Sequence, residues 1–373
     1  MKGSDVVIVG GGAVGCATAY FLAKEGVKAT VLESNRVAYG ASGYAMGLLS
    51  PLSGVGIPGP LEELSQEGFR MHRQLAGELK EATGIDYHAH PYDSLYLAFG
   101  DHRDGDLEAV DGYSGQVEGV SCQWLDGPQV RALESRVSDR VTKALMVRGS
   151  WILEAQEYTQ ALAKAAEGLG AFVRHGEVQG LRKSGANIEI RTEAGFIEAA
   201  KVVLAMGPWT GTAREWLGLP IPVHPLKGQI LRLAFHGPPL HYTLHCGGNY
   251  AGSKPDGLVW IGTTEETVGF DDRPTEEARA QIMREVALFL PAITRAYLVK
   301  QTACLRPVSA DGLPIIGQVP GWDGVYCATG AGRKGILLSP SMARAVTQLI
   351  TRGQSEVSVD LFSPARFVHT PSG

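Results

Sequence analysis

The sequence predicts an α/β protein, α+β overall, in which a Rossmann-like nucleotide-binding domain carries an inserted antiparallel-sheet domain. Two glycine-rich turns near the two ends of the chain each follow an apolar strand and precede a helix, and meander-like strand patterns lie between them. With 373 residues, the chain is long enough for two domains and a sizeable core.

The first glycine turn follows an apolar strand at residues 6–9 and leads into a helix. Gly10, Gly12 and Gly15 have the G-x-G-x-x-G spacing, and the second strand ends in Glu33. In this context Gly10 permits a tight turn, Gly12 lets a pyrophosphate approach the backbone, and Gly15 lets the helix pack closely. The start of the helix offers free N–H groups to the phosphates. The segment therefore predicts a dinucleotide site, and the Glu33 carboxylate favours a ribose hydroxyl over a 2′-phosphate.

The same stretch has an alternative interpretation as a secretory signal peptide. Residues 6–23 carry no charge, and Ala17-Thr18-Ala19 is similar to a cleavage site. However, Asp5 interrupts the short basic region, and cleavage would remove the glycine turn. We therefore expect a cytoplasmic protein. No other segment approaches the roughly 20 apolar residues that a membrane span needs.

Composition excludes several other classes of protein. The net charge is −5 and Lys and Arg form no long run, so we expect neither a nucleic-acid partner nor a membrane partner. The five cysteines are scattered without a C-x-x-C pair, and the ten histidines lack ligand spacing. We therefore expect no disulfide framework and no metal site.

The elements between the two glycine turns follow from local patterns. Residues 100–150 are polar and rich in turn residues. Elsewhere, apolar periodicity, capping residues and prolines indicate where elements begin and end. In chain order we expect a helix over 61–82, a strand at 95–98, a helix over 157–169, a strand at 171–174, a β-meander through 178–197, strands at 201–205, 229–233 and 258–262, a helix between Thr275 and Pro291, a strand at 325–329 and a helix over 341–351.

The chain resembles the family of FAD-dependent oxidoreductases that includes D-amino-acid oxidase, glycine oxidase and sarcosine oxidase, and is most similar to the glycine oxidases. The similarity of order and spacing covers nearly the whole chain and is weakest over residues 85–150. Four stretches carry it: Gly10–Gly15 with Glu33-Ser34; Ala41-Ser42 with Met46-Gly47-Leu48; residues 225–229 (Pro-Leu-Lys-Gly-Gln); and residues 305–317 with 328–338.

This resemblance implies a glutathione-reductase-type FAD fold. It implies a discontinuous FAD-binding domain at residues 1–85, 150–220 and 300–373, and a substrate-binding domain at residues 86–149 and 221–299. The residues implied to bind FAD are Gly10, Gly12, Ala13, Val14, Gly15, Glu33, Ser34, Ala41, Ser42, Met46, Gly47, Leu48, Val178, Ala331, Gly332, Arg333, Lys334, Gly335, Ile336 and Leu337.

The resemblance also implies a substrate site. Arg306 and Arg333 fall on family positions that hold the substrate carboxylate, and Tyr250 falls near a family tyrosine that hydrogen-bonds the same group. A planar guanidinium binds a carboxylate through two parallel hydrogen bonds, which agrees with this role. Structural roles are the alternative for all three residues.

Other polar and aromatic residues have simpler interpretations. We expect His245, like His224 and His241, to be a loop or interface residue, and Trp209 and Trp260 to belong to the core.

Cys304 leaves the linkage of the cofactor open. Its distance from Asp311 resembles the spacing of the flavin-linking cysteine in monomeric sarcosine oxidases. Those enzymes also place a lysine over the flavin, and residues 258–261 contain none. We expect non-covalent FAD, with a Cys304 linkage as the alternative.

The implied activity is FAD-dependent oxidation of a small α-amino acid: glycine, sarcosine or a D-amino acid. A hydride would pass from the α-carbon to flavin N5, and the products would be a 2-oxo acid, ammonia or an amine, and hydrogen peroxide. The expected partners are the amino acid and molecular oxygen or another acceptor, and we expect a homo-oligomer. The alternatives are a dehydrogenase that passes electrons to a quinone or partner subunit, and a catalytically silent FAD-binding subunit.

Overall fold

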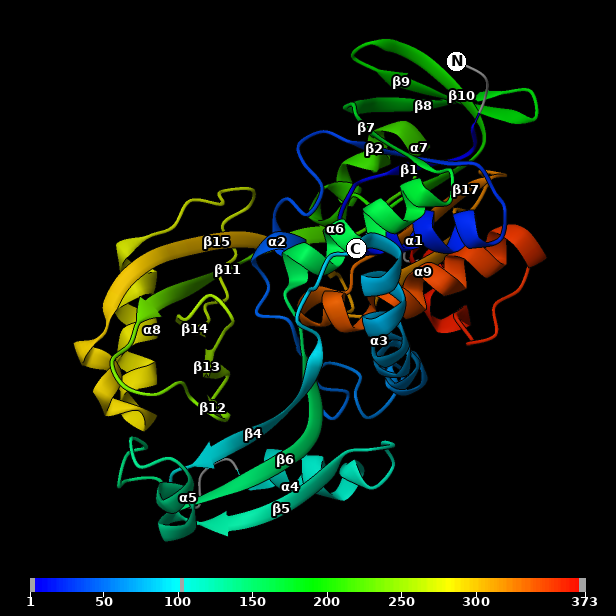
Figure 1. The fold of residues 1–373 in the computed structure, drawn as a ribbon. Helices are drawn as coiled ribbons and strands as arrows, with labels where there is room; N and C mark the ends of the chain where they lie inside the picture. Colours follow the sequence, from blue (N-terminus) through cyan, green and yellow to red (C-terminus); the bar gives the residue numbers. More distant parts are fainter. Residues whose placement is uncertain (1–3, 101–103, 369–373) are drawn as a thin grey trace.

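The computed structural model describes residues 4–100 and 104–368, which form two large sheets with helices packed on them (Figure 1). Sheet A has eight strands and sheet B has nine. None of the helices among the described residues has the length and apolar character that crossing a membrane requires.

Sheet A is mainly parallel. Its main path runs β16-β17-β10-β1-β2-β7, in which only β16 is antiparallel to its neighbour, and the β8–β9 hairpin pairs with the first half of β10. Its strands are β1 (Ser4–Val9), β2 (Ala29–Glu33), β7 (Phe172–His175), β8 (Val178–Ser184), β9 (Asn187–Thr192), β10 (Gly195–Leu204), β16 (Ile315–Gln318) and β17 (Val325–Thr329).

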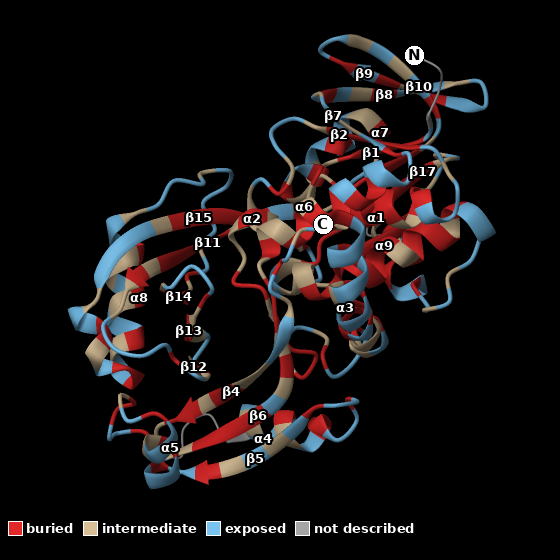
Figure 2. Cartoon of the chain, in the orientation of Figure 1, coloured by how far each residue is buried: buried red, intermediate tan, exposed pale blue. Residues whose placement is uncertain are grey.

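Both faces of the parallel strands are covered, which explains their nearly continuous apolar sequences. Val6 and Ile8 of β1 pack into a core shared with the helices, whereas Val7 and Val9 pack on the opposite face with the β8–β9 hairpin. The helices of the first face contact one another, and Figure 2 shows α1 and α9 as largely buried. They are α1 (Ala13–Lys24), α3 (Glu62–Thr83), α6 (Ala155–Gly168) and α9 (Gly335–Arg352); the opposite face carries η1 (Gly207–Ala213) and α7 (Arg214–Leu217).

Sheet B is antiparallel except where β12 runs parallel to β4. Its order is β15-β11-β14-β13-β12-β4-β6-β3, with β5 paired to β6. Its strands are β3 (Leu48–Leu49), β4 (His90–Ala98), β5 (Ser121–Asp126), β6 (Lys143–Ile152), β11 (Val223–Ala234), β12 (Thr243–Cys246), β13 (Asn249–Ser253), β14 (Val259–Gly262) and β15 (Tyr297–Ser309).

One face of sheet B packs on α8, through Leu231 and Leu233 of β11 and Ile282 and Val286 of the helix. The alternate residues of its strands, such as Ile230, point to the opposite face, toward sheet A. The remaining helices are α2 (Ala41–Tyr44), α4 (Asp104–Ser114), α5 (Gly127–Leu133), α8 (Glu276–Phe289), η2 (Pro291–Arg295), η3 (Gly332–Lys334), η4 (Asp360–Phe362) and η5 (Pro364–Phe367).

Residues 100–150, for which the sequence predicts no particular element, contain α4, α5, β5 and most of β6, which is paired on both sides. One expectation for local structure is wrong. The last helix begins at Gly335 rather than at residue 341, with Pro340 inside it. Proline cannot donate to the carbonyl four residues earlier. The Ile336 carbonyl instead accepts a bond from Ser339 Oγ and contacts His72 Nε2, both at 2.8 Å, so the helix continues through the proline.

Candidate active site

A cavity of about 1970 Å³ lies between the two sheets. Its wall includes the first glycine turn, the end of β2, the segment around α2, and the second glycine turn with the start of α9. Strands β4, β11, β12, β13 and β15 of sheet B complete it. The structure therefore brings to one wall every predicted site residue except Gly15.

The first glycine turn has the predicted construction. Gly10 has φ +110°, and a Cβ there would lie 2.4 Å from the Ala205 carbonyl oxygen. A Cβ on Gly15 would lie 2.0 Å from the Gly10 carbonyl oxygen. Gly15 therefore lets α1 pack under the turn and does not itself line the cavity.

Glu33 and Ser42 fix this turn from two sides. Glu33 Oε2 accepts a hydrogen bond from the Gly11 N–H at 2.6 Å, and Oε1 accepts one from the Asn35 N–H at 2.7 Å. Each carboxylate oxygen retains a lone pair for a ligand hydroxyl. Ser42 Oγ accepts from the Ala13 N–H at 3.0 Å, which joins α2 to the start of α1. These bonds hold the predicted cofactor segments in one arrangement.

The Met46–Leu48 segment is held against the end of β6. A Cβ on Gly47 would lie 1.9 Å from the Leu153 carbonyl oxygen, so only glycine permits this approach. Lys254, which is buried, donates to the Met46 and Leu153 carbonyls at 2.9 and 3.0 Å and pairs with Glu154 at 2.6 Å. This lysine therefore connects sheet B to the wall of the cavity.

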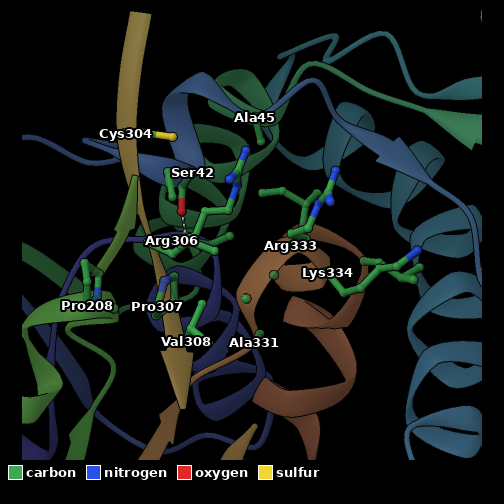
Figure 3. Close-up of a pocket in the computed structure, with 18 of the residues that line it drawn as sticks. Ser42, Ala45, Pro208, Cys304, Arg306, Pro307, Val308, Ala331, Arg333 and Lys334 are labelled. Atoms are coloured by element: carbon green, nitrogen blue, oxygen red, sulfur yellow. Dashed lines mark hydrogen bonds between the residues drawn. The ribbon is translucent and has the colours of Figure 1, made fainter. Parts of the chain in front are cut away.

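The second glycine turn carries Arg333 and Lys334 on η3, directly before α9. Lys334 Nζ donates to the Ser50 carbonyl at 2.9 Å, and Figure 3 shows its side chain directed away from Arg306 and Arg333. Burial, together with the neighbouring Arg333, lowers the pKa of Lys334 to about 8. The start of α9 faces the cavity, where its free N–H groups favour negative charge.

Arg306 reaches the cavity from β15 (Figure 3). Its Nη1 donates to the Thr264 carbonyl at 3.1 Å and its Nη2 donates to Thr263 Oγ1 at 2.8 Å. No described Asp or Glu forms an ion pair with it. A half-buried guanidinium without a carboxylate partner, held by two neutral acceptors, is suited to bind an anionic ligand.

Arg333 approaches the same cavity from η3. Its Nη1 lies 3.2 Å from Glu265 Oε1, and its Nη2 donates to the Gly248 carbonyl at 3.3 Å. Tyr250 is buried on β13, opposite Gly262 of β14. Burial raises the pKa of its hydroxyl, although Arg306 opposes the shift, so the hydroxyl stays protonated at neutral pH.

Cys304 lies two residues before Arg306, on the same strand and in the wall of the cavity. It is 7% exposed and pairs across the sheet with Gly228. Burial raises the pKa of the thiol, although Arg306 opposes the shift. The thiol is therefore protonated at neutral pH.

Three expectations for single residues are wrong. His224 is not a loop residue but an exposed residue of β11, paired with Val308. His245 is not a loop residue either: it lies on β12 in the cavity wall and stacks on Tyr96 with ring centroids 4.5 Å apart. Burial, with the nearby Lys334 and Arg333, lowers its pKa to about 3, so the ring is neutral. Trp209 is 39% exposed and lines the cavity, whereas Trp260 is buried as expected. His245 lies in no sequence motif, so no pattern marked it.

The cavity wall fits a polar cofactor with phosphates. Four buried polar atoms in it have no hydrogen-bond partner among the described residues: Ser50 Oγ, Tyr92 Oη, His245 Nε2 and Asn249 Oδ1. Buried polar groups in proteins are normally paired, so these atoms indicate a ligand or water that completes the wall. Two helix starts, α1 and α9, and the Glu33 carboxylate supply the donors and the acceptor that a dinucleotide needs.

Comparison with known proteins agrees with this geometry. Residues 5–349 match the family described as FAD dependent oxidoreductase. The chain is 29% identical over 350 residues to the glycine oxidase of Bacillus licheniformis, covering 94% of this chain and 93% of that protein. It is 30% identical over 367 residues to the glycine oxidase of Geobacillus kaustophilus, covering 98% and 97%. The crystal structure of glycine oxidase from G. kaustophilus superposes with a TM-score of 0.93 over 98% of this chain and 99% of that one.

The chain therefore belongs to the FAD-dependent oxidoreductase family. Its predicted fold class, its predicted cofactor and its assignment as an FAD-dependent enzyme are confirmed.

Proposed function

We propose that this protein oxidises a small α-amino acid, such as glycine, sarcosine or a D-amino acid, at its CH–NH bond. The products would be a 2-oxo acid, ammonia or an amine, and hydrogen peroxide. The observation that carries the proposal is Arg306, a guanidinium in the wall of the cofactor cavity that lacks a carboxylate partner among the described residues. The similarity to curated glycine oxidases supports the substrate class.

In this proposal the chain's own residues act mainly by positioning. Arg306 binds the substrate carboxylate with the fork of its guanidinium, while Thr263 and Thr264 hold that guanidinium in place. The protonated Tyr250 hydroxyl is available to donate a second bond to the same carboxylate. Fixing the carboxylate leaves the α-carbon and its amine free to face the cofactor.

The residues proposed to hold FAD are the glycine turn, Glu33, Ser42, the Met46–Leu48 segment and the start of α9. FAD, when bound, supplies a two-electron acceptor for the hydride of the α-carbon. No protein base is required when the amine is neutral, which agrees with a wall that offers Arg306 and Tyr250 to the carboxylate. The pKa values of His245 and Lys334 leave His245 neutral and Lys334 largely charged at neutral pH.

We also propose the division into an FAD-binding and a substrate-binding domain. All strands of sheet A fall within residues 1–85, 150–220 and 300–373, which supports their assignment to one domain. The proposed boundary at residue 300 falls inside β15, the strand that carries Arg306.

The test is anaerobic mixing of the purified holoenzyme with glycine, sarcosine, D-alanine and L-alanine, observed through the flavin absorbance. Glycolate, which has a hydroxyl in place of the glycine amine, is the matched control. We expect at least one amino acid to bleach the flavin and glycolate to leave it oxidised. Failure of every small amino acid to reduce the flavin would contradict the proposal. Admission of oxygen then distinguishes an oxidase from a dehydrogenase by the rate of reoxidation and the yield of peroxide.

A further inference from the structure

Two guanidiniums reach the same cavity, but they differ in what neutralises them. Arg333 faces Glu265 at 3.2 Å, whereas Arg306 has only neutral acceptors among the described residues. Both arginines and Glu265 line the cavity. The wall therefore holds one compensated guanidinium and one uncompensated guanidinium.

A single short segment links the two arginines. Arg306 Nη1 donates to the carbonyl of Thr264, and the next residue, Glu265, pairs with Arg333. Arg333 is held from its other side by the Gly248 carbonyl. The hydrogen bond between Arg306 and Thr264 thus helps to position Glu265, the next residue in the chain. Arg306 is also the guanidinium proposed to bind the substrate carboxylate.

The other charged groups nearby do not replace Glu265 as the partner of Arg333. Lys334 is a cation that donates to Ser50, and His245 is neutral because burial lowers its pKa to about 3. Glu266 follows Glu265 in the chain but pairs with Lys227 and is bonded by Gln229. A substrate with a second carboxylate could therefore bind Arg333 only by displacing Glu265. The negative charge of Glu265 would repel that carboxylate.

We infer that Glu265 is a specificity-determining residue, which compensates Arg333 and restricts the substrate to amino acids with one carboxylate. This inference rests on the proposed function, because it assumes that Arg306 binds the α-carboxylate. A monocarboxylate neutralises Arg306 and leaves the Glu265–Arg333 pair intact. A dicarboxylate places its second negative charge against Glu265, so the enzyme discriminates against it mainly in binding.

The variant that tests this is Glu265→Gln, which keeps the shape of the side chain and removes its charge. Asp272→Asn is the matched control, because Asp272 is exposed on the same loop and lies outside the cavity wall. Two substrate pairs differ only by a carboxylate: iminodiacetate against sarcosine, and D-aspartate against D-alanine. The readout is kcat/KM for anaerobic flavin reduction with each member of a pair.

We expect Glu265→Gln to raise the dicarboxylate-to-monocarboxylate ratio about 10-fold, chiefly through KM, because the freed Arg333 can bind the second carboxylate. Asp272→Asn should leave the ratio at the wild-type value. In the double variant Glu265→Gln/Arg333→Gln the dicarboxylate-to-monocarboxylate ratio should return to near the wild-type value. An unchanged ratio in Glu265→Gln, or a gain that survives loss of Arg333, would overturn the inference.

A binding measurement keeps the inference separate from the proposed function. Malonate and acetate are not amino acids, and their dissociation constants follow from the perturbation of the flavin spectrum. Glu265→Gln should raise the affinity for malonate relative to acetate by a similar factor. If no amino acid reduces the wild-type flavin, the proposed function fails. If monocarboxylic amino acids reduce the flavin but Glu265→Gln changes neither the kcat/KM ratio nor the malonate-to-acetate affinity ratio, only the inference fails.

Discussion

The guanidinium of Arg306 lies over the α-carbon of Gly228 on the neighbouring strand β11. A Cβ at Gly228 would lie 2.2 Å from Arg306 Nη2 and 2.3 Å from Cζ, so a side chain there and the observed guanidinium exclude each other. Gly228 is the glycine of the Pro-Leu-Lys-Gly-Gln stretch. Its role in the structure is therefore to leave room for the arginine.

We predict that Gly228→Ala displaces the Arg306 side chain and raises KM for the best amino acid by about 10-fold or more, because a misplaced binding group loses its alignment with the substrate. The flavin should remain bound, since Gly228 lies outside the segments proposed to hold the cofactor. Steady-state kinetics and the flavin content of the purified variant check both statements. Gly77→Ala, at an exposed helix position with open space around it, should change neither. A wild-type KM in Gly228→Ala would mean that the arginine can act from another position.

Arg306 itself should be the main source of substrate affinity. We predict that Arg306→Ala lowers kcat/KM about 30- to several-thousand-fold, because truncating one partner of a desolvated charge pair costs about 2–5 kcal/mol. Arg306→Lys should recover only part of the loss, since an ammonium cannot bind both carboxylate oxygens in a fork. Arg182→Ala, on the exposed β8–β9 hairpin, is the control. Wild-type kcat/KM in Arg306→Ala would make the arginine structural.

Glu33 should contribute to the affinity for FAD and not to the binding of the amino acid. Its two oxygens accept backbone bonds from Gly11 and Asn35, and an amide can satisfy only one of these donors. We predict that Glu33→Gln weakens FAD binding about 10- to 100-fold, because a hydrogen bond to a charged group contributes about 1.5–3 kcal/mol. Titration of apoprotein with FAD measures this effect. The exposed Glu193→Gln should bind FAD normally, and an unchanged affinity in Glu33→Gln would show that the carboxylate charge is unimportant.

His72 should make the protein less stable in acid. Burial lowers its pKa to about 4, whereas an unfolded histidine titrates near 6.5. Between these values the unfolded chain binds a proton that the folded chain does not, so stability falls as the pH drops from about 6.5 to 4. We predict that His72→Gln removes up to about 3 kcal/mol of this pH dependence.

The measurement is the free energy of unfolding by urea between pH 7 and 4, in the wild type, in His72→Gln and in the exposed His90→Gln. The glutamine amide introduced by His72→Gln can still donate to the Ile336 carbonyl. The comparison therefore measures the effect of histidine protonation on stability without the loss of this hydrogen bond. Parallel curves for the wild type and His72→Gln would contradict the assignment of this acid sensitivity to His72.

Much of sheet A could be predicted from sequence, because its evidence is local. The spacing of Gly10, Gly12 and Gly15, the acid at the end of β2 and the apolar run in β10 each reflect contacts within one short segment. The strand order could not be read from them. The position of β10 between β1 and β17 depends on contacts between segments far apart in the sequence, for which no local pattern exists.

The missed parts of the site depend on contacts between segments that are distant in the sequence. The helix α9 runs through Pro340 because His72, on another helix, contacts the carbonyl that the proline leaves free. His245 becomes a wall residue because β12 pairs with β4, which brings Tyr96 against its ring. Glu265 has no motif and is defined only by its contact with Arg333. A single sequence contains the residues but not these pairings.

Cys304 provides the last test, because it distinguishes non-covalent FAD from a linkage like that of the sarcosine oxidases. Attack by cysteine requires the thiolate. The structure buries the Cys304 thiol and raises its pKa, with only partial opposition from Arg306, so the thiolate is scarce at neutral pH. As a buried residue of β15, the protonated thiol serves as a small apolar group.

We therefore predict that FAD separates from the chain when the wild-type protein is precipitated with acid or denaturant. Cys304→Ser and Cys304→Ala should retain the wild-type FAD content and nearly wild-type kcat/KM. Cys327→Ser, at a buried thiol outside the cavity wall, controls for the effect of altering a buried cysteine on stability alone. Flavin that stays with the precipitated wild-type chain and is released by Cys304→Ser would establish the covalent linkage. Arg306 would then have to lower the thiol pKa more than burial raises it.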